Sequence, residues 1–264
     1  VLLSLRSAAS PGQGAVYGWA FGSGLFLAGV AGVYVSLSVF GGMPAWLAGL
    51  ATLFFCLVLA LYPALAGALA VRLRSASPTL DALAFAALWT LTEWLRGWLL
   101  TGFPWLAAGY AQTPPSPLAG YAPVVGVYGL SFASALIGAL GAACILETTA
   151  GRALQGRRKA VVAGLAVMLV LAGGALLRGV AWTTPHGAPI TVALLQGNVP
   201  QDLKWRPELF DASLRTYYQL ALDHPAQLTV LPETALPAFY DRIPRAYLET
   251  LAGLARRQDG DLLL

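Results

Sequence analysis

The feature that most constrains this chain is a long stretch without any charge. Between Ala15 and Val71 the sequence contains no Asp, Glu, Lys, Arg or His. Across the whole chain 11% of the residues are charged and 58% are hydrophobic, whereas ordinary soluble domains are about 25% charged. One soluble core could not bury so much apolar surface. The stretch therefore predicts that lipid surrounds the first two thirds of the chain.

Five apolar segments reach, or nearly reach, the roughly 20 residues that are needed to span a bilayer. We expect membrane helices at residues 15–40, 46–71, 80–100, 118–146 and 160–177. Gly41, Gly42 and Pro44 predict a tight turn between the first two. Frequent glycines within the segments would let the helices approach closely. Residues 1–180 are therefore expected to form a transmembrane helical domain.

Basic residues in the short loops predict how these helices are oriented. Arg6 precedes the first helix, and Arg72 and Arg74 follow the second. The loop between the fourth and fifth helices holds Arg152, Arg157, Arg158 and Lys159. The loops on the opposite side hold no Lys or Arg. The basic loops should face the cytoplasm, which places the residues after Leu177 in the periplasm of a bacterium. The net charge of +4 forms no basic stripe, so we expect no nucleic-acid partner.

The composition becomes that of a soluble domain after Arg178. Residues 190–196 and 228–231 predict short buried strands, and residues 261–264 begin a third. Residues 207–222 and 244–257 predict amphipathic helices. Alternating strands and helices indicate a layered α/β domain over residues 188–264, of which the first third is present.

Glu233 is the candidate catalytic residue of this second domain. It follows a predicted strand and Pro232, and reactive groups collect at the carboxyl ends of strands in α/β sheets. A general base working near neutral pH needs a raised pKa, which partial burial beside apolar groups could supply. A carboxylate that merely caps the following turn would show the same spacing, so spacing alone leaves both interpretations open.

Several motifs resemble those of one family, in the expected order. Residues 231–235 (LPETA) are similar to the glutamate motif of the nitrilase superfamily. The longer motif LQGNVPQDLKW, at residues 195–205, resembles bacterial apolipoprotein N-acyltransferases. So do TEWLRGW (92–98), TGFPW (101–105), GYAQ (109–112), YVS (34–36) and FGGMP (40–44). The resemblance implies a multi-pass α-helical membrane bundle followed by the start of an α/β nitrilase-like (αββα) domain.

This resemblance implies an activity that ends in lipoprotein maturation. The family transfers an acyl chain from a membrane phospholipid to the N-terminal α-amine of diacylglyceryl-cysteine apolipoproteins, through a thioester on a catalytic Cys. Glu233 matches the family's general base. The family's Lys, which stabilises the oxyanion, and its Cys lie later in the domain. Neither Cys56 nor Cys144, both within membrane helices, can replace that Cys.

We therefore expect the chain to be a fragment that is truncated at both ends and inactive by itself. Two membrane helices before Val1 and one after the soluble domain would be missing. The resemblance implies an inner-membrane protein that acts as a monomer, and we expect no metal and no other cofactor.

Two neighbouring residues of the 195–205 motif are candidates beside Glu233. Trp205 matches a family Trp near the active site that activity requires; a loop aromatic packed on the domain surface is the alternative. Lys204 is expected to be a solvated loop charge, with contact to a phospholipid headgroup as the alternative, and it is not the catalytic Lys.

Five residues of the membrane domain are candidates for substrate binding. Glu93 and Arg96 are costly in a membrane helix, and their spacing of three would let them form an ion pair. They could also form the floor of a lipid-access cleft. Trp105, Tyr110 and Gln112 occupy the uncharged loop after the third helix. There they would line the entrance for the acyl chain or belong to an interfacial aromatic belt.

Two other classes of function remain open. A membrane-tethered nitrilase-type amidase would use the same catalytic groups with water as the acceptor, but a hydrolase of soluble amides would not need five membrane helices. A transporter or scaffold would carry ionisable residues in several helices, or internal repeats. Here the third predicted helix alone carries such residues.

Overall fold

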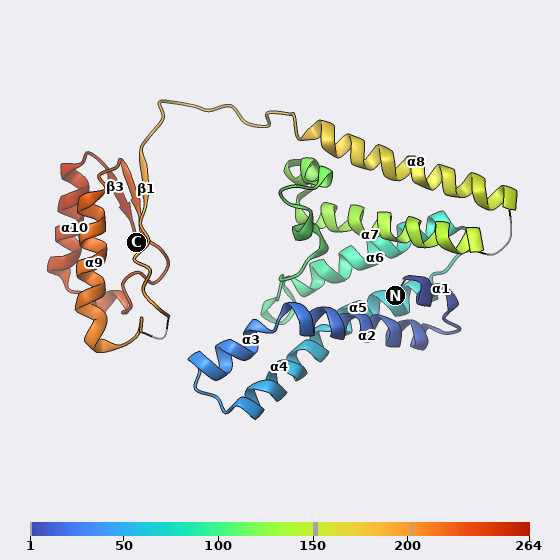
Figure 1. The fold of residues 1–264 in the computed structure, drawn as a ribbon, viewed down its shortest axis with the longest axis horizontal. Coiled ribbons are helices and arrows are strands. Elements are labelled where there is room, and N and C mark those ends of the chain that lie inside the picture. Colours follow the sequence, from blue (N-terminus) through green and yellow to red (C-terminus); the bar gives the residue numbers. More distant parts are fainter. Residues whose placement is uncertain (1, 150–152, 202) are drawn as a thin grey trace. The chain divides into compact units, whose positions relative to one another are not determined.

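The computed structural model describes residues 2–149, 153–201 and 203–264. The chain divides into two compact units, Val1–Thr183 and Thr184–Leu264, which we call the helical unit and the α/β unit (Figure 1). Val1, Arg152 and Asp202, which belong to the predicted start, basic loop and motif, lie outside the described residues.

The helical unit consists of helices joined by short turns. In chain order its elements are α1 (Leu2–Ser7), α2 (Pro11–Gly29), α3 (Gly32–Val35), the π-helical turn η1 (Ser36–Phe40), α4 (Ala45–Leu59), α5 (Leu61–Arg72), α6 (Pro78–Arg96), η2 (Leu99–Thr101), η3 (Ala108–Gln112), η4 (Pro117–Tyr121), α7 (Ala122–Thr149) and α8 (Ala153–Leu177). Ser10 and Ser77 cap α2 and α6, since each side chain accepts a hydrogen bond from the first turn of its helix.

The helical unit contains several candidate membrane spans. Within the described residues, three helices are long and apolar enough to cross a membrane: Ala45–Arg72, Pro117–Ile145 and Ala160–Leu177. The pair Pro11–Gly29 and Gly32–Phe40 qualifies as a fourth if it is counted as one bent span. Helix α6, predicted as a span over residues 80–100, is not in this group. It carries Asp81, Glu93 and Arg96 and ends at Arg96.

The segment predicted as one helix at residues 15–40 is bent in the structure. The chain leaves the helical path at Val30, and the two segments meet at an angle of 51°. Gly29 lies at the break, where an added Cβ would be 2.3 Å from the Leu106 Cδ1 atom. Val30 and Phe26 are buried in a cluster against which Leu106 packs. A side chain from a distant loop therefore packs at the bend, where flanking glycines weaken the helix.

Helices α2 and α5 pack closely because three glycines face the partner backbone. Gly14, Gly18 and Gly22 recur every four residues along one face of α2 and are buried. An added Cβ would lie 2.5 Å from the Gly67 carbonyl oxygen at Gly14 and 2.2 Å from the Pro63 carbonyl oxygen at Gly18. Such small-residue faces let membrane helices approach at the backbone.

We expect Gly18→Ala to destabilise the helical unit by about 1–3 kcal/mol, because the methyl group has to displace the α5 backbone. Gly24→Ala on the same helix is the matched control, since nothing lies within 4 Å of its added Cβ. Alanine should leave stability there unchanged or slightly raised. Thermal unfolding of both variants in detergent micelles, followed by circular dichroism, measures the difference. Equal melting temperatures would contradict the close approach.

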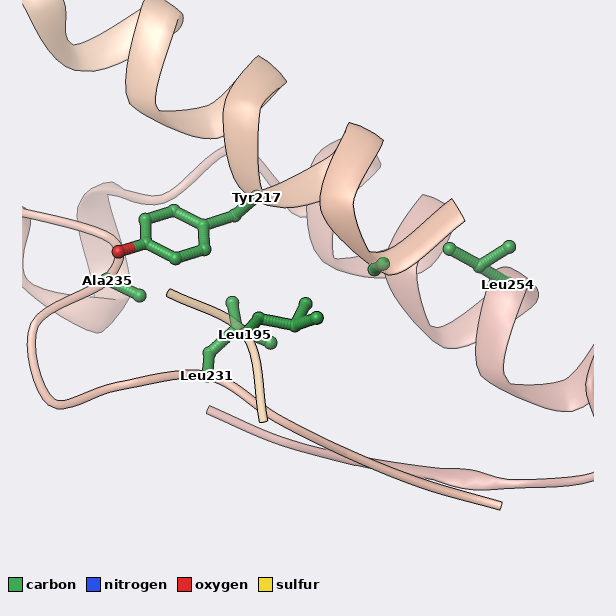
Figure 2. Close-up of a cluster of buried hydrophobic side chains, with 6 residues drawn as sticks. Leu195, Tyr217, Leu231, Ala235 and Leu254 are labelled. Carbon is green, nitrogen blue, oxygen red and sulfur yellow. The ribbon is translucent and has the colours of Figure 1, made fainter. Parts of the chain in front are cut away.

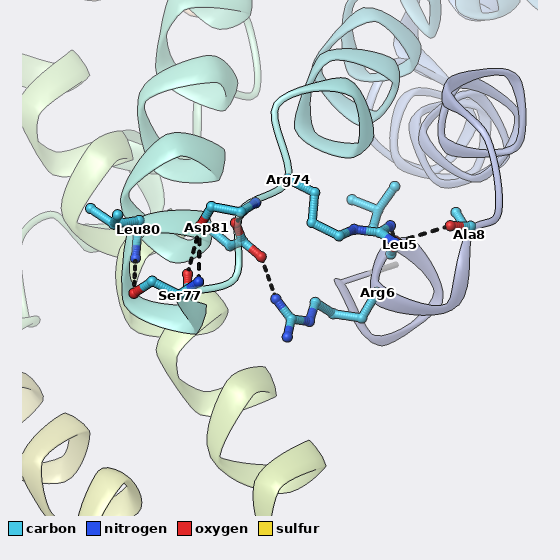
Figure 3. Close-up of polar contacts among 8 residues, drawn as sticks. Leu5, Arg6, Ala8, Arg74, Ser77, Leu80 and Asp81 are labelled. Atoms are coloured by element: carbon cyan, nitrogen blue, oxygen red, sulfur yellow. Dashed lines mark hydrogen bonds and ion pairs between the residues drawn. The ribbon is translucent and has the colours of Figure 1, made fainter.

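Polar contacts tie α1 to the segment that leads into α6 (Figure 3). The Arg6 guanidinium donates to the Asp81 carboxylate, whose other oxygen accepts from the Ser75 N–H at 2.7 Å. Arg74 donates to the Ala8 carbonyl at 3.2 Å and to the Leu5 carbonyl. Two of the basic segments that the sequence predicted to share one side therefore meet around the start of α6.

The α/β unit is built on a small parallel sheet. Strands β1 (Val192–Leu194), β2 (Leu228–Val230) and β3 (Asp261–Leu263) lie in the order β1-β2-β3. The connections contain η5 (Pro207–Leu209) and α9 (Phe210–Asp223), then η6 (Tyr240–Arg242) and α10 (Arg245–Arg257). The strands are shorter than predicted, although hydrogen bonds continue past β1 at both ends, from Leu228 N to the Thr191 carbonyl and from Leu195 N to the Val230 carbonyl.

The two helices cover one face of this sheet. Leu195 and Leu231, each one residue beyond its strand, are buried together with Tyr217 and Ala221 of α9 and Leu254 of α10 (Figure 2). The Tyr247 hydroxyl donates to the Leu214 carbonyl at 2.8 Å and ties α10 to α9. Burial raises the pKa of Tyr247 to about 12, so this donor stays protonated at neutral pH. On the other face of the sheet the apolar side chains Val192, Leu194 and Leu263 are exposed.

Candidate functional site

The Glu93 carboxylate is buried near the end of α6 and holds two donors. Its Oε1 atom accepts from the Trp89 indole N–H at 2.8 Å and from the Ala108 backbone N–H at 3.0 Å. The side chain is 5% exposed. Among the described residues, its Oε2 atom is a buried oxygen without a hydrogen-bond partner. Glu93 also lines a small cavity, together with Tyr62, Thr92 and Leu106.

The Arg96 guanidinium lies one turn further along α6 and binds carbonyl groups of the same loop. Its Nη1 atom donates to the Phe103 carbonyl at 2.7 Å and also to the Trp105 carbonyl. Its Cζ atom lies 5.1 Å from the centre of the Phe26 ring. At 3% exposure, this charge is stabilised by carbonyl oxygens and an aromatic face.

The predicted ion pair between these two residues is wrong. Within the described part of the chain, Arg6–Asp81 is the pair that falls within 4.0 Å. Glu93 and Arg96 instead bind main-chain atoms of the segment that follows α6. The backbone segment that folds against the helix offers carbonyl groups to Arg96 and an amide N–H to Glu93. Each buried charge therefore has a hydrogen-bond partner without the other charge. We call these contacts the Glu93–Arg96 clamp.

The clamp holds a strained segment. Leu100, Thr101 and Leu106 have φ values of 54°, 74° and 61°, in the left-handed region that side chains other than glycine avoid at a cost of roughly 1–2 kcal/mol per residue. Such a conformation persists where surrounding contacts determine it. The buried charges and the Leu106 contact at Gly29 supply those contacts.

Trp105, Tyr110 and Gln112 project from the held segment in different surroundings. Trp105 is 57% exposed, although its carbonyl is bound by Arg96, and its ring lies 5.2 Å from the Phe103 ring. Tyr110 is also exposed. The Gln112 side-chain oxygen accepts from the Ser116 hydroxyl at 2.9 Å. The two aromatic side chains are therefore presented outward by a loop whose backbone is fixed.

Two residues of this site, Ser131 and Trp89, were not predicted from the sequence. The Ser131 hydroxyl on α7 is fully buried and accepts from the Gly109 N–H at 2.9 Å. An added Cβ at Gly109 would be 2.1 Å from the Val127 carbonyl oxygen, so this contact requires glycine. The role of Trp89 could have been found, because it precedes Glu93 by one helical turn. Ser131 gave no signal, since its partner is a backbone amide.

In the α/β unit, the ends of β1 and β2 form one edge of the parallel sheet. Leu194 pairs with Val230, so the turns at Gly197 and Glu233 both begin three residues past a matched pair. Pro232 has no N–H and ends the ladder. Thr234 and Asn198 adopt positive φ values of 54° and 49°, and the Ala235 N–H closes a tight turn on the Pro232 carbonyl at 3.0 Å.

Glu233 lies at the apex of this turn, and its side chain is exposed. The partial burial expected for a general base is not present around it in this chain. Its backbone carbonyl accepts a hydrogen bond from the Lys204 ammonium group at 3.1 Å. Lys204 therefore differs from the expected solvated charge, because it joins the loop after β1 to the turn after β2.

Trp205 follows Lys204 directly and is 59% exposed. It comes from the same edge of the sheet as Glu233, and the Lys204 bond brings its loop to the Glu233 turn. The seven predicted site residues therefore form two groups. Glu93, Arg96, Trp105, Tyr110 and Gln112 lie in the helical unit, and Glu233 and Trp205 lie in the α/β unit.

Comparison with known proteins gives these groups a context. Three relatives named apolipoprotein N-acyltransferase match most of this chain. The protein of Nitrosomonas europaea is 47% identical over 260 residues, which is 98% of this chain and 50% of the relative. The protein of Chromobacterium violaceum is 45% identical over 240 residues, which is 91% of this chain and 45% of the relative. The protein of Methylococcus capsulatus is 44% identical over 259 residues, which is 97% of this chain and 49% of the relative.

The chain thus spans about half the length of these relatives. The model of one protein family, described as the apolipoprotein N-acyltransferase N-terminal domain, matches residues 1–140. This region contains the Glu93–Arg96 clamp and the loop that it holds. Because the match covers more than half of the chain and the relatives agree with it, the chain belongs to the apolipoprotein N-acyltransferase family.

Proposed function

We propose that the full-length protein, which we take to extend over the length of its relatives, transfers an acyl chain from a membrane phospholipid to an apolipoprotein. The acceptor is the α-amine of the N-terminal diacylglyceryl-cysteine. The observation that carries the proposal is Glu233 at the carboxyl end of a parallel strand, in a chain of this family. Family members at 44–47% identity bear the name of this activity.

The α/β unit is, in this proposal, the first part of a nitrilase-like domain, and residues 1–180 and 188–264 are the two domains. Its parallel strands with both helices on one face support this assignment. Parallel sheets are usually covered on both faces. The exposed Val192, Leu194 and Leu263 mark the face on which a second layer of an αββα arrangement would pack.

Glu233 acts as the general base in a two-step exchange. Its carboxylate accepts the proton of a Cys thiol, and the thiolate attacks the ester carbonyl of the phospholipid. The thioester forms as the lysophospholipid alcohol leaves with a proton. In the second step the amine of the lipoprotein attacks the thioester, Glu233 accepts the amine proton, and the thiol is restored as the amide forms. The Cys and the oxyanion-stabilising Lys belong to the part of the protein outside this chain.

The clamp gives the acyl donor a fixed surface. Trp105 and Tyr110 are exposed on a segment whose backbone is held by buried charges. Indole and phenol side chains favour the level of the lipid headgroups. We propose that these two residues and Gln112 contact the phospholipid near its ester, with Glu93 and Arg96 fixing their position.

We also propose the orientation that the basic loops predicted. Arg6 and Arg74 lie around the start of α6, and Arg158 lines a groove that includes Thr79. These basic segments therefore share one end of the helical unit, which the charge rule assigns to the cytoplasm. In this orientation the bacterial inner membrane holds the helical unit, and the α/β unit is periplasmic.

An acyl-transfer assay tests the function. The full-length protein in micelles receives a phospholipid with a labelled acyl chain and a peptide that begins with diacylglyceryl-cysteine. We expect the labelled acyl chain to become attached to the peptide through an amide bond. No label should reach the peptide when its amine is acetylated beforehand. Labelled free fatty acid, formed at the same rate with either peptide, would show hydrolysis with water as the acceptor and would contradict the proposal.

A further inference from the structure

A groove on the outside of the helical unit has an apolar floor and a basic end. It runs between α6, α7 and α8, and its apolar wall includes Leu83, Leu136, Leu140 and Val162. Thr79 and Arg158 also line it. On each helix the lining residues are four apart, as in Thr79 and Leu83 or Arg158 and Val162. The groove therefore runs along the helices, with its polar residues at one end.

The apolar part of the groove faces outward. Leu83 and Val162 are 40% and 60% exposed, and the Ala160–Leu177 span is buried over 6% of its length within the protein. In a bilayer such a surface meets hydrocarbon, and acyl chains fill the space between the helices.

Arg158, at the basic end, forms no ion pair within the part of the chain that the structure describes. Arg158 is exposed, and among the described residues no carboxylate lies within 4.0 Å of it. In the sequence, Arg157 and Lys159 flank Arg158, and Glu147 is the nearest acidic residue before them. Asp81, the acidic residue near the start of α6, is bound by Arg6 and Ser75. A positive charge thus stands at the end of an apolar groove.

We propose that this groove binds one anionic phospholipid, separate from the acyl donor. The Arg158 guanidinium binds the phosphate through charge-assisted hydrogen bonds, Thr79 lies beside the headgroup, and an acyl chain lies along Leu83, Leu136 and Val162. Basic pockets between membrane helices bind anionic headgroups by the same chemistry. The bound lipid fastens α8 to α6 and α7.

Native mass spectrometry of the 264-residue chain in micelles tests this site with two lipids that share their acyl chains. Phosphatidylglycerol carries a net negative charge and phosphatidylcholine carries none. We expect one phosphatidylglycerol to remain bound per chain and phosphatidylcholine to be lost. Arg158→Gln should weaken phosphatidylglycerol binding about tenfold, and Arg158→Lys should retain most of it.

Arg72→Gln is the matched control, because Arg72 is an exposed basic residue in the last turn of α5 and does not line the groove. Its variant should bind phosphatidylglycerol like the unaltered chain. Equal retention of both lipids, or equal weakening by Arg158→Gln and Arg72→Gln, would overturn the proposal. So would a lipid-free dimer that excludes both lipids. None of these outcomes bears on acyl transfer, which the full-length assay measures.

Discussion

Replacing Glu233 by Gln in the full-length protein should lower the rate of thioester formation from phospholipid about a thousandfold. Glutamine keeps the size of the side chain but accepts no proton at neutral pH, and a positioned general base contributes roughly 10²–10⁴ in rate. The backbone carbonyl that Lys204 binds is unchanged, so the turn should keep its shape. Trapping the acyl-enzyme with a labelled phospholipid, in the absence of acceptor, measures this step directly.

Glu249→Gln provides the control for this experiment. Glu249 is an exposed carboxylate on α10, and its variant should form the thioester at the normal rate. Thermal unfolding of both proteins separates lost catalysis from lost folding. Undiminished thioester formation in a folded Glu233→Gln protein would remove Glu233 from the mechanism.

Replacing Arg96 by Leu should destabilise the helical unit by about 3–5 kcal/mol, the cost of breaking a buried charged contact on one side. The Phe103 and Trp105 carbonyls would lose their donor. Glu93 would also remain buried without the nearby positive charge. Thermal unfolding of the chain in micelles should show the loss, and limited proteolysis should cut residues 99–112 much faster.

Arg72→Leu is the comparison for this variant. Arg72 is exposed at the end of α5, so its loss should change stability by no more than about 0.5 kcal/mol. Arg96→Lys keeps the charge but lacks the planar fork that reaches two carbonyl oxygens, and we expect an intermediate loss. If Arg96→Leu and Arg72→Leu unfold alike and resist protease equally, the clamp does not hold the loop.

Hydrophobicity predicted the parts of the fold that depend on local composition. Where the sequence predicted spans at residues 118–146 and 160–177, the structure has the helices α7 (Ala122–Thr149) and α8 (Ala153–Leu177). The bend at Val30 depends on Leu106 packing at Gly29. No local pattern reports a contact between residues so far apart in the sequence. Helix α6 was extended too far because the apolar residues continue past Arg96, where the loop turns back on the helix.

The candidate site shows the same limit. Helical spacing places Glu93 and Arg96 on one face, and that part of the reasoning is sound. It also suggested that they bind each other, whereas both are satisfied by backbone groups of the next segment. The sequence gives the identity of each side chain, but it does not show which backbone groups that side chain will bind. For this reason Ser131 and the Lys204 contact with Glu233 were also missed.

The clamp recognises Phe103, Trp105 and Ala108 through their carbonyl and amide groups. Anchorage of this kind does not depend on which side chains those positions carry. Under the proposed function, relatives could therefore exchange the outward-facing residues to suit different acyl donors while the path of the chain stays the same. Specificity at this surface can diversify separately from stability, as long as the two buried charges remain.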